Sequence, residues 1–214
     1  MAMSPARTET AIAILAKAPI PGLAKTRLIP ELGAHGAAVL QEQFTERAVE
    51  TAIAAGIGPV LLWATPDEVH SAFGELARRF PIALARQPDG DLGQRILAAF
   101  EAGAKLVIGT DCPALTPAHL SDAAAALQDN DLAIVPAEDG GYVLIAMTNP
   151  QPALFKDIAW GDSQVMQDTR QRAMTAGLKT HEFRPLWDVD RPEDLERLRP
   201  YEAFRPFVRN SSDD

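Results

Sequence analysis

The chain has 214 residues, which fits one domain, since two domains would have only about 100 residues each. Its 20 basic and 29 acidic side chains give a net charge of −9, which excludes binding of nucleic acid or an anionic membrane by bulk charge alone. The single cysteine excludes an intrachain disulfide and a thiolate-rich zinc site. With no 18-residue apolar stretch, no membrane span is expected, and we expect a cytoplasmic protein.

Short apolar runs alternate with helical patterns along the chain. The runs mostly lack in/out alternation, so they are predicted to be strands buried on both faces of a mainly parallel sheet. The predicted strands are residues 11–16, 59–64, 82–85, 106–109, 132–135 and 142–147. The predicted helices are residues 34–55, 67–79, 91–102, 117–128, 163–176 and 192–199.

This alternation predicts an α/β fold with functional loops at the carboxyl ends of the strands. Residues 11–200 are expected to form a single domain. We expect a disordered or extended arm at residues 1–10 and a C-terminal tail at residues 201–214. A homodimer through an exposed sheet edge is left open.

The loop after the first predicted strand carries three cations, Lys17, Lys25 and Arg27, in an otherwise acidic chain. In an extended segment, Lys25 and Arg27 project to the same side, because successive side chains alternate. Two cations on one side can hold a diphosphate, and Gly22 would let the backbone approach the phosphates. The alternative is a solvated basic loop. The loop matches neither a P-loop nor a dinucleotide fingerprint.

Two further segments carry acids next to predicted strands or helices. Asp111 follows the fourth strand, where a carboxylate either coordinates a phosphate-bearing cation or stabilises a turn. The neighbouring Cys112 is expected to be structural. Asp188 and Asp190 share one face if their segment is extended, so they are candidates for a second metal ligand. The alternative is that one of them orders the helix that begins at Pro192.

Two glycine-containing loops remain. Residues 136–142 contain two acids followed by two glycines, which predicts a hairpin turn, a close approach of ligand to backbone, or both. The segment at Trp160–Ser163 precedes a helix, and its Asp162 and Ser163 are candidate caps or anion ligands. Trp160 itself is predicted to belong to the core rather than to a ligand platform.

Taken together, these segments resemble the DUF2064 family of bacterial proteins. Members are described as glycosyltransferase-like, or as rSAM/selenodomain-associated or arsenosugar-biosynthesis transferases, and the resemblance covers residues 11–200. The family is similar to transferases of the GT-A, nucleotide-diphospho-sugar transferase class, which have a three-layer, Rossmann-like α/β/α fold. Its Lys-Thr-Arg loop is similar to that of guanylyltransferases. The segments are AKAPIPGLAKTRL at 16–28, GDLGQR at 90–95, GTDCPALTP at 109–117, EDGGY at 138–142 and DVDRPEDL at 188–195.

The resemblance implies a division of labour within the site. The implied catalytic residues are Asp111, Lys25, Arg27 and, as base, Asp139. The implied nucleotide-binding residues are Lys17, Pro21, Gly22, Lys25, Arg27, Gln87, Gly90, Gly93 and Asp111. The implied acceptor-binding residues are Glu138, Gly140, Gly141, Tyr142, Trp160 and Ser163. The implied ligands of a Mg²⁺ or Mn²⁺ ion are Asp111, Asp188 and Asp190.

Three functions follow as hypotheses. The first is a metal-assisted glycosyltransferase that takes a nucleotide-diphosphate sugar and a small-molecule acceptor. The second is a nucleotidyltransferase that transfers a nucleoside monophosphate from an NTP to a phosphorylated acceptor and releases pyrophosphate. The third is a non-catalytic nucleotide-binding protein, because Asp111 stands where GT-A enzymes have two acids in an Asp-x-Asp motif.

Overall fold

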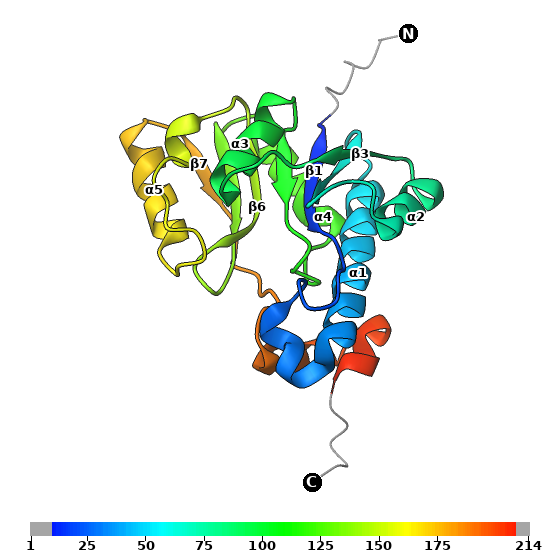
Figure 1. Cartoon of the computed structure of the whole chain (residues 1–214). Helices are drawn as coiled ribbons and strands as arrows, with labels where there is room; N and C mark the ends of the chain where they lie inside the picture. The colour runs from blue at the N-terminus through cyan, green and yellow to red at the C-terminus, as the bar shows by residue number, and fades with distance from the viewer. Residues whose placement is uncertain (1–9, 209–214) are drawn as a thin grey trace.

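The computed structural model describes residues 10–208, which form a seven-stranded sheet with helices on both faces (Figure 1). The spatial order of the strands is β3-β2-β1-β4-β6-β5-β7. Every neighbouring pair is parallel except the two that involve β6, which runs antiparallel to β4 and β5. The strands are β1 (Ile12–Lys17), β2 (Val60–Thr65), β3 (Ile82–Arg86), β4 (Leu106–Ile108), β5 (Leu132–Pro136), β6 (Tyr142–Met147) and β7 (Thr180–Glu182).

Helices cover both faces of this sheet, which confirms the expected three-layer α/β/α fold. One core cluster joins the sheet to α1, α2 and α4, and a second joins its other face to α3 and α5. No helix within residues 10–208 combines the length and the apolar character that a membrane crossing requires. The α-helices are α1 (Ile29–Ala55), α2 (Ser71–Arg79), α3 (Leu92–Glu101), α4 (Pro117–Ala126) and α5 (Val165–Thr175).

The six predicted strands are all present. Strands β4 and β5 are buried at every position, which explains why their sequences are unbroken apolar runs. Strand β7 was not predicted, because all three of its residues are exposed at the sheet edge and none forms an apolar run. The reversal between β5 and β6 is the hairpin that residues 136–142 predict.

The helix boundaries follow local signals. Gly33 interrupts α1 with a positive φ of 69°, so the regular helix starts after it, at the predicted position. Helix α2 begins at Ser71 rather than at residue 67, because the ring of His70 accepts a hydrogen bond from the Ala72 N–H and caps the helix there. Asp91 caps α3 as predicted, with Gln94 as its capping-box partner.

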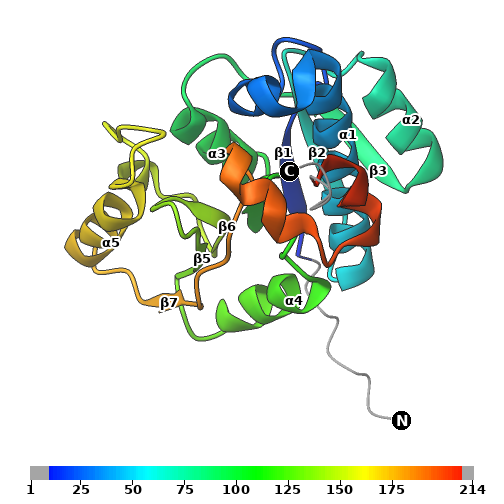
Figure 2. The ribbon, with the colours of Figure 1, turned by 90° about the horizontal axis from the view of Figure 1, so that it is seen from below.

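The C-terminal part differs from the expected tail. Short 3-10 helices η3 (Pro192–Leu198) and η4 (Glu202–Phe207) lie beside the start of α1, beyond the carboxyl end of β1 (Figure 2). Phe204 is buried, and its ring centroid lies 4.9 Å from that of Phe44 on α1. Residues 201–208 are therefore packed, while residues 209–214, and residues 1–9 of the arm expected at residues 1–10, lie outside the described part.

Candidate functional site

A cavity of about 580 Å³ opens at the carboxyl ends of β1 and β4. This is the edge where the connections of a mostly parallel sheet place ligand-binding loops. Three cationic and five acidic side chains line it, so its own charge is negative. The charged lining residues are Lys17, Lys25, Arg27, Asp111, Asp139, Asp162, Asp188 and Asp190.

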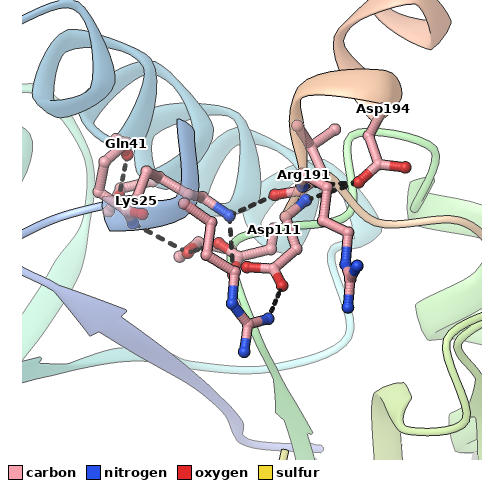
Figure 3. A network of polar contacts seen from close by, with 10 residues as sticks. Lys25, Gln41, Asp111, Arg191 and Asp194 are labelled. Atoms are coloured by element: carbon pink, nitrogen blue, oxygen red, sulfur yellow. Dashed lines mark hydrogen bonds and ion pairs between the residues drawn. The ribbon is translucent and has the colours of Figure 1, made fainter. Parts of the chain in front are cut away.

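Lys25 occupies the inner end of the loop after β1. Its side chain is only 3% exposed, and its Nζ lies 2.6 Å from the carbonyl oxygen of Val189 and 2.9 Å from Oδ2 of Asp111. The ammonium also lies 5.4 Å from the centre of the Phe44 ring. Lys25 therefore joins the β1 loop, the β4 loop and the 188–190 segment, as Figure 3 shows for Lys25 and Asp111.

Arg27 lies at the outer end of the same loop and pairs with Asp190. The expected extended segment is wrong, because Thr26–Leu28 form a 3-10 turn, η1, and Lys25 has a left-handed backbone with φ of 46°. Lys25 and Arg27 therefore do not present two free cations side by side. Arg27 remains 60% exposed, and Lys17 also lines the cavity. Pro21 and Gly22, also expected at the nucleotide, are not among the lining residues.

Asp111 is held by a relay of hydrogen bonds that begins inside α1. The buried Gln41 donates from Nε2 to Oγ1 of Thr110, 3.0 Å away, and that hydroxyl donates to Oδ1 of Asp111, also at 3.0 Å. Figure 3 shows Gln41 and Asp111 in this network. The sequence analysis missed Gln41 and Thr110. The only signal for Gln41 was a polar residue on the buried face of a helix.

Asp188 is a partly buried acid with two other carboxylates nearby. Burial, together with the nearby Asp139 and Asp111 carboxylates, raises the pKa of Asp188 to about 6. A cation among these carboxylates would relieve their repulsion. Mg²⁺ and Mn²⁺ prefer oxygen ligands, and Mg²⁺ is commonly held by one or two carboxylates with substrate phosphates and water. The donor chemistry of Asp111 and Asp188 therefore fits such an ion.

The expected three-carboxylate metal set needs correction. Within residues 10–208, no group of three or more His, Cys, Asp or Glu side chains has an arrangement that could hold a metal. Asp190 lines the cavity, but it pairs with Arg27. Asp111 and Asp188 remain as candidate ligands, and the other positions around an ion would belong to substrate oxygens and water.

The β5–β6 hairpin loop is fixed by its backbone. Gly140 has φ of 98°, and a Cβ at this position would lie 2.1 Å from the carbonyl oxygen of Ser163. The N–H of Met166 donates to the carbonyl of Gly140 at 2.7 Å. Asp139 accepts from the N–H of Gly141 at 3.0 Å and lines the cavity. The hairpin loop and the start of α5 therefore form one junction, which presents Asp139.

Three residues expected at the acceptor are not among the lining residues: Glu138, Gly140 and Ser163. Glu138 accepts two hydrogen bonds from Arg197, at 2.7 and 3.1 Å, and this pairing lowers the pKa of Glu138. Gly140 and Ser163 meet through their backbones. Gly141, Tyr142 and Trp160 do line the cavity, so this part of the expected acceptor set is brought together.

The residues expected near the base have structural roles and do not line the cavity. The buried Gln87 donates from Nε2 to the carbonyls of Ala16 and Trp63, at 3.1 and 2.6 Å, and so ties β1 to β2. Gly90, with φ of 121°, packs against its neighbour Gln94. Gly93 lies under the indole of Trp160, where a Cβ would approach Cζ2 to 2.5 Å.

Cys112 also lines the cavity, and burial raises the pKa of its thiol to about 12. A thiol with this pKa supplies almost no thiolate near neutral pH, so it is a poor nucleophile and a poor metal ligand. This agrees with its expected structural role.

Three of the solved structures that match this fold are described as transferases. A candidate nucleotide-diphospho-sugar transferase from Desulfovibrio desulfuricans G20 is 29% identical, with a TM-score of 0.79, and the match covers 92% of this chain and 90% of that one. A Methanothermobacter nucleotidyl transferase is 17% identical, with a TM-score of 0.61 and coverage of 93% and 99%. A cytidylyltransferase from Leptospira borgpetersenii is 16% identical, with a TM-score of 0.56 and coverage of 92% and 87%.

The fold is therefore that of the nucleotide-diphospho-sugar transferase class. Residues 48–162 match the family described as "Uncharacterized protein conserved in bacteria (DUF2064)". The chain belongs to this family, as the sequence motifs indicate. A comparison with functionally curated proteins gave no match.

Proposed function

We propose that the protein is a glycosyltransferase that uses a nucleotide-diphosphate sugar, a divalent metal ion and a small-molecule acceptor. The observation that carries this proposal is the charge of the cavity. The cavity is lined by five acidic and three cationic side chains, and two of the cations, Lys25 and Arg27, are already paired with acids. Its net negative charge would repel a diphosphate unless a metal cation bound with it. Asp111 and Asp188 are the proposed ligands of that ion. When bound, it would neutralise the diphosphate and stabilise the leaving nucleotide.

The remaining roles follow from exposure and position. The exposed Arg27 is the proposed contact for the phosphates, because its guanidinium offers a fork of N–H donors to them. Asp139 is the proposed base: it would take the proton of the acceptor hydroxyl as the oxygen bonds to the sugar. The bond between the sugar and the phosphate would break with its electron pair on the nucleoside diphosphate.

Lys25 has a different proposed role from the one that the resemblance implies. Its ammonium already contacts Val189 and Asp111, so we assign it to positioning the two carboxylate segments. Among the three solved structures described above, the Desulfovibrio structure has the largest TM-score and the highest sequence identity. This similarity supports sugar transfer over nucleotidyl transfer.

Nucleotidyl transfer is the second candidate, favoured by the fold shared with the Methanothermobacter and Leptospira structures. The same acids and ion would then bind an NTP, and the products would include pyrophosphate. A phosphorylated acceptor is less compatible with the acidic side chains of the cavity, which is why sugar transfer is preferred.

A thermal-shift screen tests the proposal with UDP-sugars, GDP-sugars, GTP, CTP and UTP, each with Mn²⁺, Mg²⁺ or EDTA. A ligand at 100 times its Kd stabilises the fold by about 2.7 kcal/mol. We expect stabilisation by one nucleotide sugar with metal, its loss in Asp111→Asn and its retention in Asp89→Asn, whose side chain is 96% exposed outside the cavity.

The reaction itself is followed by product analysis. Release of a nucleoside diphosphate from the stabilising nucleotide sugar, stimulated by an acceptor, would support sugar transfer. Pyrophosphate release from an NTP would replace it with nucleotidyl transfer. Binding without turnover would leave the non-catalytic hypothesis, and no shift with any compound would overturn all three.

A further inference from the structure

One side of the cavity is formed by the sheet, by α3 and by the loop before α5. Side chains from three strands form the floor there, and α3 and the loop before α5 form the walls. All of these side chains are apolar. We call this region the apolar pouch, lined by Leu15, Val107, Ile145, Leu92, Ile96 and Trp160.

The pouch follows from ordinary side-chain periodicities. Leu15, Val107 and Ile145 lie on the sheet face that α3 and α5 cover, within one core cluster. Leu92 and Ile96 are four residues apart on α3, so they project from the same face of that helix. The apolar side chains of the sheet and of α3 therefore line the same cavity.

Trp160 forms a fixed wall of the pouch. Its indole packs on Gly93, a position where the Cβ of any other residue would collide with the ring. The Trp160 and Tyr142 rings are in edge-to-face contact, with their centroids 6.3 Å apart. Its Nε1 is buried and donates to no group within residues 10–208. A ligand oxygen that reached this N–H would satisfy a buried donor that the described protein leaves unpaired.

Some of the large apolar side chains that line the cavity are also exposed to solvent. Residues 10–208 contain four exposed large hydrophobic residues, and two of them, Leu23 and Leu92, line this cavity. They are 54% and 44% exposed. A ligand in this cavity would remove part of their surface from water.

The acidic side chains beside the apolar pouch favour an uncharged ligand over an anionic one. The cations of the cavity come from β1 and the loop that follows it, whereas Asp139 and Asp162 flank Tyr142 and Trp160 in the sequence and also line the cavity. An anionic group on this side would meet like charges. We infer that the acceptor is an uncharged hydroxyl compound whose alkyl or aryl group fills the apolar pouch. This inference rests on the proposed function, since it names the class of the second substrate.

Binding of n-alkyl β-D-glucosides tests the inference without a known donor. Ethyl, butyl and hexyl glucoside are titrated while tryptophan fluorescence is followed, and hexyl phosphate serves as the anionic probe. Each methylene buried in the pouch should tighten binding about fourfold. Hexyl phosphate should bind more weakly than hexyl glucoside, because its charge faces the acids.

Variants locate the binding. Leu92→Gln should weaken hexyl glucoside about fivefold or more, and its partial exposure makes misfolding unexpected. Met174→Gln is the matched control, since Met174 is 69% exposed on α5 and does not line the cavity. Affinity that does not depend on chain length, or equal losses in both variants, would overturn the inference.

Two further outcomes separate this inference from the proposed function. A nucleotide sugar with Mn²⁺ that displaces hexyl glucoside would show that the pouch takes part of the donor, and would overturn the inference alone. Chain-length dependence without binding of any nucleotide sugar would preserve the pouch as an apolar subsite and overturn the proposed function. Simultaneous binding of both probes supports the two together.

Discussion

The inner and outer ends of the loop after β1 carry the same charge in very different surroundings. Lys25 is 3% exposed and held between Asp111 and the carbonyl of Val189, whereas Arg27, two residues later, is 60% exposed and pairs with Asp190. Cations that look equivalent in the sequence therefore divide into one that holds the site together and one that remains available to a ligand.

The cause lies in the packing beneath the loop. The ammonium of Lys25 lies over Phe44, which contacts Phe204 of η4, so the C-terminal helices help to close the space around it. A buried cation without a partner is costly, and Asp111 and Val189 supply the compensation. Arg27 has no such enclosure, and its exposed ion pair adds little to stability.

Replacing Lys25 by Met should have the largest effect on this contrast. The apolar stem is preserved, but Val189 and Asp111 lose a charged donor, so the free energy of unfolding should fall by about 1–3 kcal/mol. Urea denaturation measures this, with the exposed Lys156→Met as control. Equal stability of the Lys25 variant and wild type would show that Lys25 is not a structural link.

Asp188→Asn should have an intermediate effect that depends on pH. Because the pKa of Asp188 is raised to about 6, the folded state holds this proton more tightly than the unfolded state. That stabilising contribution is present below about pH 4 and is lost as the pH rises through 6. Without divalent metal, the variant should gain about 1 kcal/mol over wild type between pH 4 and 7, after allowance for solvent screening.

Urea denaturation at pH 4 and pH 7 measures this gain, and Asp89→Asn is the control. A difference between variant and wild type that stays constant with pH would contradict the raised pKa.

Arg27→Gln should have the smallest effect on stability. An exposed ion pair contributes little, so the free energy of unfolding should change by no more than about 0.5 kcal/mol. Affinity for the nucleotide sugar identified in the screen should fall about tenfold, because charge-assisted hydrogen bonds to phosphate are lost. Isothermal titration calorimetry measures the affinity. Unchanged affinity would remove Arg27 from the proposed phosphate contacts and weaken the contrast with Lys25.

Much of the fold could be predicted from the sequence, because buried strands and capped helices leave local signals. The apolar runs mark β1 to β6, and the Asp91–Gln94 capping box marks the start of α3. Strand β7 and helix η4 carry no such signal. The first is a three-residue exposed edge strand, and the second is a short 3-10 helix that is ordered by the packing of Phe204 on Phe44.

The site was predictable in position but only partly in its contacts. Placing Asp111, Asp188 and Asp190 around one cavity requires only that loops gather at the carboxyl edge of the sheet. The pairing of Lys25 with Asp111, and of Arg27 with Asp190, depends on the left-handed backbone at Lys25 and the 3-10 turn that follows. Gln87 and Gly93 were assigned to the nucleotide, but their tertiary contacts give them packing roles.

The bond between Lys25 and Val189 joins residues 164 positions apart. During synthesis, β1 to β6 and their helices emerge from the ribosome before the 188–190 segment does. A nascent chain can therefore assemble most of the sheet while its cavity still lacks Asp188 and Asp190. The proposed site for a metal ion and a nucleotide would then be completed only in the last stage of synthesis, when the 188–190 segment reaches the loop that was made near the beginning.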